Sequence, residues 1–362
     1  MIMTGLRGVG KTVLLNRFAE LAEMAGWESI ELEASKHDET AFRQSIFSKF
    51  RAALLHISPR RRWTERARHA AEVLSSFVLS IDQSGTFSVT WDVDPSEGYG
   101  DHGDLGLDLT DVFLAVGEVA KEKGTGIVLL IDEVQFLTTV QLESLIQAVH
   151  KSVQKKLPIT FVGAGLPQIA ELAGDAKSYA ERLFKFPRID SLTPEEARQA
   201  LVGPAETENV SYDEDAVDLA VSLTHGYPYF IQELGYQAWI VASGNHITAE
   251  DISTAKDAYE AKLDGSFFRV RLDRATPLQT AYMRAMAELG SEPQKAADVA
   301  SLMKRESSQV APIRSQLIDM GLLYTPQHGY AAFTVPDFDK FMMRAVPRLE
   351  VPEIQHRRRR KK

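Results

Sequence analysis

The chain opens on a glycine-rich loop followed directly by a helical pattern, and no other feature constrains its fold as strongly. Residues 5–12 read Gly-Leu-Arg-Gly-Val-Gly-Lys-Thr, which matches the pattern G-x-x-x-x-G-K-[S/T]. Because glycine has no Cβ atom, this backbone can curl and point successive N–H groups at an anion. Apolar Met1–Met3 precedes the loop, and an amphipathic helix is expected over Thr12–Ala25. The pattern therefore predicts a strand, a phosphate-binding turn and a helix whose positive end faces the phosphate.

The side chains of this loop predict that the phosphate belongs to ATP and that Mg²⁺ accompanies it. The Lys11 ammonium can lie between the β- and γ-phosphates, and the Thr12 hydroxyl is a typical Mg²⁺ ligand. An ordinary glycine-rich turn is the alternative interpretation. The residues expected to contact the nucleotide here are Gly5, Arg7, Gly8, Val9, Gly10, Lys11, Thr12 and Val13.

A second motif lies far along the chain, where the apolar run Gly126–Ile131 ends in Asp132 and Glu133. A strand apolar on both faces is typical of a parallel sheet. After a phosphate loop, Asp132 is expected to hold Mg²⁺, directly or through water. Glu133 is expected to orient or deprotonate the water that attacks the γ-phosphate. Two solvated acids at a strand end are the alternative.

Strand and helix patterns alternate through the first half of the chain, which predicts an α/β fold: the parallel sheet of a P-loop NTPase with helices on both faces. The segment 59–107 interrupts this alternation and is interpreted as an insertion, with a β-hairpin expected over Phe77–Trp91. The strands are expected at Trp27–Ala34, Gly126–Asp132, Ile159–Gly163 and Phe184–Ile189.

Strand patterns disappear from Thr193 onward, and the remainder is predicted to be mostly helical. Three helices followed by a strand–turn–strand pattern after residue 276 predict a winged helix-turn-helix. Its second motif helix, Gln309–Met320, is expected to turn Val310, Ile313 and Leu317 inward. The predicted domains are the ATPase core 1–191, a helical lid 192–270, the winged helix-turn-helix 271–348 and a basic tail 349–362.

Charge is distributed unevenly over a chain whose net charge is −9. Residues 294–362 carry 13 Lys/Arg and 7 Asp/Glu, a net of +6, and six of the cations form the terminal run Arg357–Lys362. This distribution predicts contact with double-stranded DNA through the winged helix and the tail. A merely solvated tail is the alternative.

Composition excludes several classes of protein. The chain has no cysteine, so disulfides, thiolate metal sites and cysteine nucleophiles are excluded. No apolar run approaches the roughly 20 residues of a membrane span, and the phosphate loop follows the N-terminus too closely for a signal peptide. We therefore expect a cytoplasmic protein that is not associated with a membrane.

With both motifs, a helical segment and a C-terminal winged helix, the chain resembles AAA+-type ATPases of the origin-recognition and archaeal-ATPase kind. The tetrapeptide His225-Gly-Tyr-Pro228 is similar to the G-x-P element of signal-transducing STAND ATPases. That resemblance implies that Pro228 packs against adenine, whereas a helix-initiating proline is the alternative. Arg182 resembles the arginine finger that reaches the γ-phosphate of a neighbouring subunit, which implies a homo-oligomer; a local ion pair with Glu181 or Asp190 is the alternative.

The chain also departs from these families. The strand end Phe161–Gly165 lacks the usual polar sensor, for which Gln168 is a candidate substitute, and the lid lacks an evident sensor arginine. The chain begins four residues before the loop, where the resembled families carry a longer first strand and an adenine-contacting segment. A truncated N-terminus is therefore one expectation, and slow hydrolysis is another.

The sequence thus favours a Mg²⁺-dependent ATP-binding protein that hydrolyses ATP and acts as a nucleotide-dependent switch, with DNA as the expected target. Two other interpretations stay open. The chain can be a DNA-binding regulator with a structural or vestigial nucleotide site, or a STAND-like signalling scaffold whose winged helix binds protein.

Overall fold

The computed structural model describes residues 1–34, 39–79, 93–177 and 180–352. Contacts between residues divide the chain into two compact units. The first consists of Met1–Gly5 and Lys11–Ile189, and the second consists of Leu6–Gly10 and Asp190–Lys362. Each unit is described by itself.

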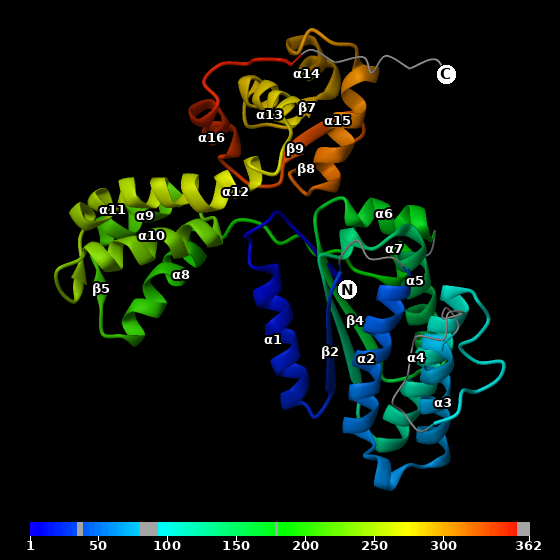
Figure 1. Cartoon of the computed structure of the whole chain (residues 1–362). Coiled ribbons are helices and arrows are strands. Elements are labelled where there is room, and N and C mark those ends of the chain that lie inside the picture. The colour runs from blue at the N-terminus through cyan, green and yellow to red at the C-terminus, as the bar shows by residue number, and fades with distance from the viewer. Residues whose placement is uncertain (35–38, 80–92, 178–179, 353–362) are drawn as a thin grey trace, which may run out of the picture. The chain divides into compact units, whose positions relative to one another are not determined.

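The first unit is built on a parallel sheet (Figure 1). Strand β3 is central, pairing Leu129 with Ile30 of one neighbour and with Phe161 of the other. The strand order is β1-β4-β3-β2, and every pairing is parallel, which confirms the predicted sheet. The strands are β1 Ile2–Thr4, β2 Glu28–Glu33, β3 Ile127–Asp132 and β4 Ile159–Gly165.

Helices connect these strands, and local sequence signals set several of their ends. Asp104 caps α4 by accepting the Leu107 N–H at 2.9 Å, and Gly124 ends the same helix with a left-handed φ of 69°. The helices are α1 Lys11–Met24, α2 Glu39–Ile57, α3 Glu65–Leu79, α4 Leu105–Lys123, α5 Thr139–Gln154, α6 Ile169–Ala176 and α7 Ala180–Leu183, with 3-10 turns at Arg60–Arg62 and Val134–Phe136.

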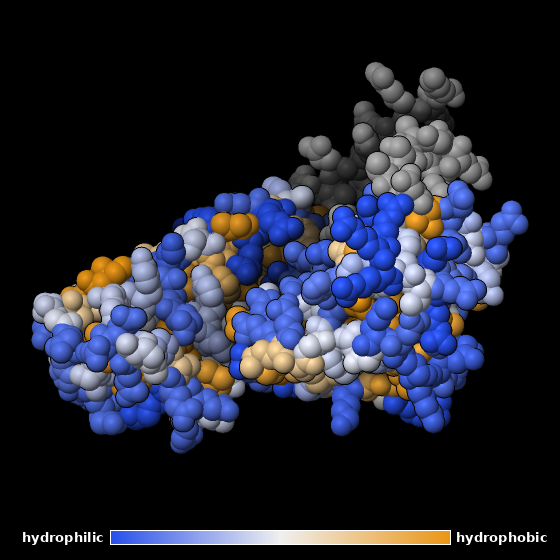
Figure 2. Space-filling model, turned by 90° about the horizontal axis from the view of Figure 1, so that it is seen from below, coloured by the Kyte–Doolittle hydropathy of each residue, from blue (hydrophilic) through white to orange (hydrophobic). Residues whose placement is uncertain are grey.

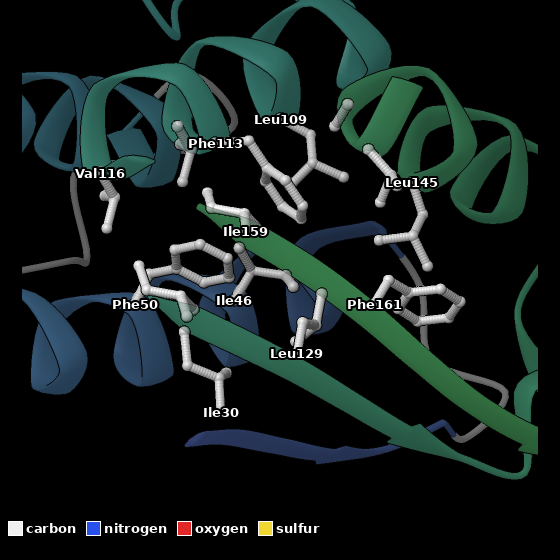
Figure 3. Close-up of a cluster of buried hydrophobic side chains, with 14 of the residues drawn as sticks. Ile30, Ile46, Phe50, Leu109, Phe113, Val116, Leu129, Leu145, Ile159 and Phe161 are labelled. Carbon is white, nitrogen blue, oxygen red and sulfur yellow. The ribbon is translucent and has the colours of Figure 1, made fainter. Parts of the chain in front are cut away.

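Alternation along β3 divides the core between the two faces of the sheet. Ile127, Leu129 and Ile131 belong to a large cluster with α2, α3, α4 and α5, part of which is shown in Figure 3. Val128 and Leu130 belong to a smaller cluster with α1. Helices therefore cover both faces, as predicted, and a strand apolar at every position is explained by burial on both sides.

The segment between α2 and α4 differs from the prediction. It contains α3, whose alanines and larger apolar residues recur at helical spacing, with Ala67, Ala70, Leu74 and Phe77 fully buried. The expected hairpin is wrong at its start, because residues 77–79 are helical, and its remainder lies outside the described residues.

The strand expected at Phe184–Ile189 is reduced to a single parallel bridge between Arg188 and Thr4. This segment still pairs with β1. The Ile2 N–H donates to Lys185 O at 2.8 Å, and the Thr4 N–H donates to Pro187 O at 2.9 Å. Proline has no N–H to return, so a regular ladder cannot form here.

The second unit begins with helices, the first of which starts as its sequence predicts. Thr193 and Glu196 form a capping box around Pro194. The expectation that strands disappear is wrong in detail, because two-residue strands β5 Ser211–Tyr212 and β6 His246–Ile247 pair in parallel. The helices are α8 Pro194–Thr207, α9 Glu214–Thr224, α10 Pro228–Val241, α11 Ala249–Lys262 and α12 Arg269–Leu272, with a π-helical turn at Leu263–Phe268.

The C-terminal part of this unit combines four helices with an antiparallel sheet of order β7-β9-β8. As expected, Val310, Ile313 and Leu317 are the buried residues of α15. Phe268 of the π-helical turn stacks on Phe341 with ring centroids 5.2 Å apart. The elements are α13 Pro277–Leu289, β7 Gln294–Lys295, α14 Ala296–Leu302, α15 Ser307–Asp319, β8 Leu323–Tyr324, β9 Tyr330–Phe333 and α16 Phe338–Ala345.

Candidate functional site

The glycine-rich loop runs from the end of β1 to the first residue of α1. Gly8 and Gly10 have φ angles of +88° and +91°, in the left-handed region that favours glycine. The Gly5 N–H donates to Gly165 O of β4 at 3.1 Å, which ties the start of the loop to the sheet. The strand, turn and helix expected from the sequence are therefore all present.

Lys11 is the first residue of α1, and its side chain is held against the loop. The residue is only 8% exposed, and its Nζ donates to Gly5 O at 3.0 Å. A buried ammonium group requires oxygen partners. Phosphate oxygens are stronger partners than a carbonyl because they carry charge. The position therefore suits the predicted phosphate contact.

The two residues predicted to hold Mg²⁺ come together although 119 residues separate them in the chain. Thr12 Oγ1 donates to Asp132 Oδ2 at 2.5 Å. Asp132 is the last residue of β3, and Thr12 follows the loop in α1, so the sheet brings the two motifs to one edge. A hydroxyl and a carboxylate are the hard oxygen donors that Mg²⁺ prefers, so this pair fits the ion.

Glu133 adopts a left-handed backbone conformation, with a φ of 52°. Non-glycine residues held there cost about 1–3 kcal/mol and are concentrated at functional sites. The Glu133 N–H donates to Asp132 Oδ1 at 2.7 Å, so the two acids of the motif are fixed together. This geometry is compatible with the role predicted for Glu133, which stays a prediction.

The structure adds Gln135, which the sequence analysis missed. Its Nε2 donates to Glu133 Oε2, and its Oε1 accepts the Leu166 N–H at 2.9 Å. Gln135 therefore connects the predicted base to the end of β4. A Cβ atom at Gly165 would lie 2.8 Å from Gln135 Oε1, which explains the glycine at the strand end where a polar sensor was expected.

Gln168, the candidate substitute for that sensor, lies at the start of α6. Its Oε1 is buried and accepts no hydrogen bond from the described residues. Gln135, rather than Gln168, is thus the amide that contacts Glu133. The sequence signal for Gln135 was its position three residues after Asp132, in Asp132-Glu133-Val134-Gln135. A turn directly after a strand can direct such a side chain back toward the strand end.

The other loop residues have contrasting environments. Val9 is 5% exposed, whereas Val13 is 70% exposed. Within the second unit, the Arg7 N–H donates to Thr334 O at 3.1 Å, and the Arg7 guanidinium lies against Gly321, where a Cβ atom would be 2.5 Å from Nη2. These contacts of Arg7 could not be expected from its place in the motif.

Pro228 is the first residue of α10, which agrees with its interpretation as a helix initiator. On either side of it, the Tyr227 hydroxyl donates to Arg7 O, and the Tyr229 N–H donates to Gly8 O at 3.2 Å, all within the second unit. Burial raises the pKa of Tyr227, so its hydroxyl keeps the proton that it donates. The adenine contact of Pro228 stays a prediction.

Arg182 lies in α7 and is exposed. The side chain of Glu181 is outside the described residues, and Asp190 belongs to the second unit. The predicted finger acts on another copy of the chain, so its role stays a prediction.

Comparison with known proteins agrees with this geometry. Residues 1–171 match a family described as an AAA domain, and residues 265–342 match a domain of unknown function (DUF8462). We call residues 1–171 the AAA domain, after the family model that they match. No curated protein matches the chain.

Solved structures of other proteins align with most of this chain, and one of them, with a TM-score above 0.5, shares its fold. The Walker-type ATPase of Pyrococcus abyssi is similar over 94% of this chain and 90% of its own, with a TM-score of 0.57 and 16% identity. The RuvB Holliday junction branch migration motor of Thermotoga maritima aligns over 97% and 87%, with a TM-score of 0.44 and 13% identity. Cdc6p from Pyrobaculum aerophilum aligns over 96% and 88%, with a TM-score of 0.43 and 15% identity.

The AAA domain has the P-loop fold of nucleotide-binding ATPases. In the part of the chain that the structure describes, no helix is long and apolar enough to span a membrane.

Proposed function

We propose that the AAA domain binds ATP with Mg²⁺ and hydrolyses it slowly. The observation that carries this proposal is the 2.5 Å contact between Thr12 Oγ1 and Asp132 Oδ2, which unites the two motifs. Thr12 and Asp132 would hold Mg²⁺, which supplies positive charge that stabilises the phosphate oxygens. The loop amides and Lys11 bind the β- and γ-phosphates of the substrate.

Glu133 is the proposed general base. Its carboxylate accepts a hydrogen bond from Gln135, and its backbone is fixed beside Asp132. Gln135 is a positioning residue, because it holds the base and is itself held by the Leu166 N–H. Arg182 is proposed to act in a neighbouring subunit of a homo-oligomer, and Pro228 is proposed to contact adenine.

We further propose that the region 271–348 is a winged helix-turn-helix that contacts double-stranded DNA. The exposed face of α15 supports this, since Ser308, Gln309, Ser315 and Gln316 point outward and Arg314 is half-buried at its edge. Such side chains can hydrogen-bond base edges or phosphate. The predicted basic tail, beyond Pro352, lies outside the described residues. A protein partner for the winged helix is the competing function.

The test is ATP binding and steady-state hydrolysis by the full chain, with and without duplex DNA, for wild type and Lys11→Ala. We expect Lys11→Ala to lose most ATP affinity, because the loop amides alone cannot balance the triphosphate charge. Hydrolysis that responds to DNA would support the switch. Wild-type protein that binds ATP and never hydrolyses it would favour a regulator with a structural nucleotide site, and unchanged ATP affinity in Lys11→Ala would refute the nucleotide site itself.

A further inference from the structure

The connection between α2 and α3, together with the first turn of α3, is rich in arginine. Residues 59–69 contain five arginines and one glutamate, in a chain whose net charge is −9. All five arginines are exposed. They are Arg60, Arg61, Arg62, Arg66 and Arg68, and we call this segment the arginine turn.

The backbone of the arginine turn is held in place by its own hydrogen bonds. The Arg62 N–H donates to Pro59 O at 2.7 Å, and the Arg68 N–H donates to Thr64 O at 3.0 Å. Trp63 packs against the large core cluster, and its Nε1 donates to Ser58 O at 2.8 Å. A ligand of this turn would therefore find the backbone already ordered, which lowers the entropic cost of binding.

Three of these charges, those of Arg61, Arg62 and Arg68, have no acidic partner among the described residues. Arg66 reaches Glu122 only at 3.7 Å. Adjacent cations on a fixed turn repel one another. A polyanion would relieve that repulsion, whereas basic residues placed only for solubility are usually mixed with acids.

The arginine turn lies near the end of the sheet where β3 begins, whereas the candidate nucleotide site lies where β3 ends. Thr64 and Arg66 contact Glu122, near the end of α4, just before β3 begins at Ile127. The Mg²⁺ candidate Asp132 ends the same strand, about 17 Å farther along it at about 3.3 Å per residue. In Figure 1 the α2–α3 connection lies at the lower end of the first unit, and Figure 2 shows the first unit from that side, where hydrophilic residues predominate. A ligand here need not overlap the nucleotide.

We propose that the arginine turn binds the phosphate backbone of double-stranded DNA. Guanidinium groups match phosphate oxygens in geometry as well as charge. A protein interface would require an apolar centre, and a membrane surface would favour an exposed aromatic anchor. The turn offers neither, because Trp63 is directed into the core. This contact is separate from the winged helix and tail, and it does not require ATP hydrolysis.

The test compares the full chain with R61A/R62A/R68A by anisotropy of a short labelled duplex in a NaCl series without nucleotide. Each phosphate contact contributes about 0.9 to the slope of log affinity against log salt, so the variant should lose about 2.7. Between 50 and 200 mM salt, wild type should therefore lose about 40-fold more affinity than the variant. The charge-preserving variant R61K/R62K/R68K should keep most of the wild-type slope.

The matched control is K151Q/K155Q/K156Q, which removes three exposed cations from the end of α5. Its slope should stay at the wild-type value, and all variants should bind ATP as wild type does. The control cations precede β4, whose first residue pairs with Ile127, so they lie at the same end of the sheet as the arginine turn. An equal fall in the control would mean that the arginine turn is not the specific contact, which would overturn the proposal. Unchanged slope in R61A/R62A/R68A, measured also in a chain ending at Pro352 to remove the tail, would overturn it as well. Competition by polyglutamate as effective as by duplex would assign the surface to acidic protein instead.

Discussion

Replacement of Gly165 by alanine tests whether Gln135 positions the catalytic base. The new Cβ atom would lie 2.8 Å from Gln135 Oε1, closer than a real contact allows, whereas the next neighbour, Ile169, is 3.6 Å away. Gln135 must therefore move, and the Leu166 N–H, which belongs to a residue 1% exposed, loses its acceptor. An unsatisfied buried N–H costs about 1–3 kcal/mol, so we expect the free energy of unfolding to fall by that amount.

Hydrolysis should fall as well, because Glu133 loses the hydrogen bond that Gln135 donates to it. We expect about a tenfold lower kcat, equivalent to about 1.4 kcal/mol, with ATP affinity unchanged. The measurements are chemical denaturation, steady-state turnover and nucleotide titration. Gly203→Ala is the matched control, since a Cβ atom there has no neighbour within 4 Å, and alanine in this helix should be neutral or slightly stabilising.

A double-mutant cycle gives the decisive result. If Gly165→Ala acts by displacing Gln135, it should change stability and kcat very little in a Gln135→Ala background, where the space is open. If the two substitutions are instead additive in both quantities, the effect of Gly165→Ala does not pass through Gln135, and the positioning role assigned to that amide is wrong.

Three further predictions concern single residues. Glu133→Gln should keep ATP affinity and lower turnover by at least about 100-fold, the usual weight of a general base, and wild-type turnover would remove it from the mechanism. Arg182→Ala should leave nucleotide binding intact and abolish any rise of specific activity with protein concentration; activity independent of concentration in wild type argues against a trans-acting finger. Phe341→Ala should lower the free energy of unfolding of the C-terminal region by about 3–5 kcal/mol, because the ring is 2% exposed and stacked on Phe268. Met343→Ala on the same helix, 43% exposed, is the control and should cost little.

The features that could be predicted from the sequence are those determined by contiguous residues. The loop of residues 5–12 has a fixed spacing, and β3 is a continuous apolar run ending in acids. Once both are recognised, parallel strands place Thr12 and Asp132 at one edge, and the contact between them follows. The start of α8 could be predicted in the same way, because the capping threonine, the proline and the first acidic residue occupy consecutive positions.

What could not be predicted depends on distant contacts or on weak patterns. The bond from Leu166 to Gln135 spans 31 residues, and nothing in either segment alone indicates it. Helix α3 was missed because its buried stripe is largely alanine, which contributes little to an apolar pattern, while Phe77 and Val78 suggested a strand. The two-residue strands β5 and β6 are too short to show any period.

The contacts of the loop give the proposed switch a physical basis. Residues Leu6–Gly10 group with the second unit, where Arg7 donates to Thr334, Tyr227 donates to Arg7 and Tyr229 donates to Gly8. Backbone N–H and C=O groups require partners, so a loop that rearranges around a triphosphate must keep these bonds or replace them. If the proposed nucleotide changes these bonds, its binding and the placement of α10 and Thr334 are linked, and linkage is reciprocal. Under the proposed switch, a partner that favours one placement of this region would change the affinity for ATP by the same factor by which ATP changes the affinity for that partner.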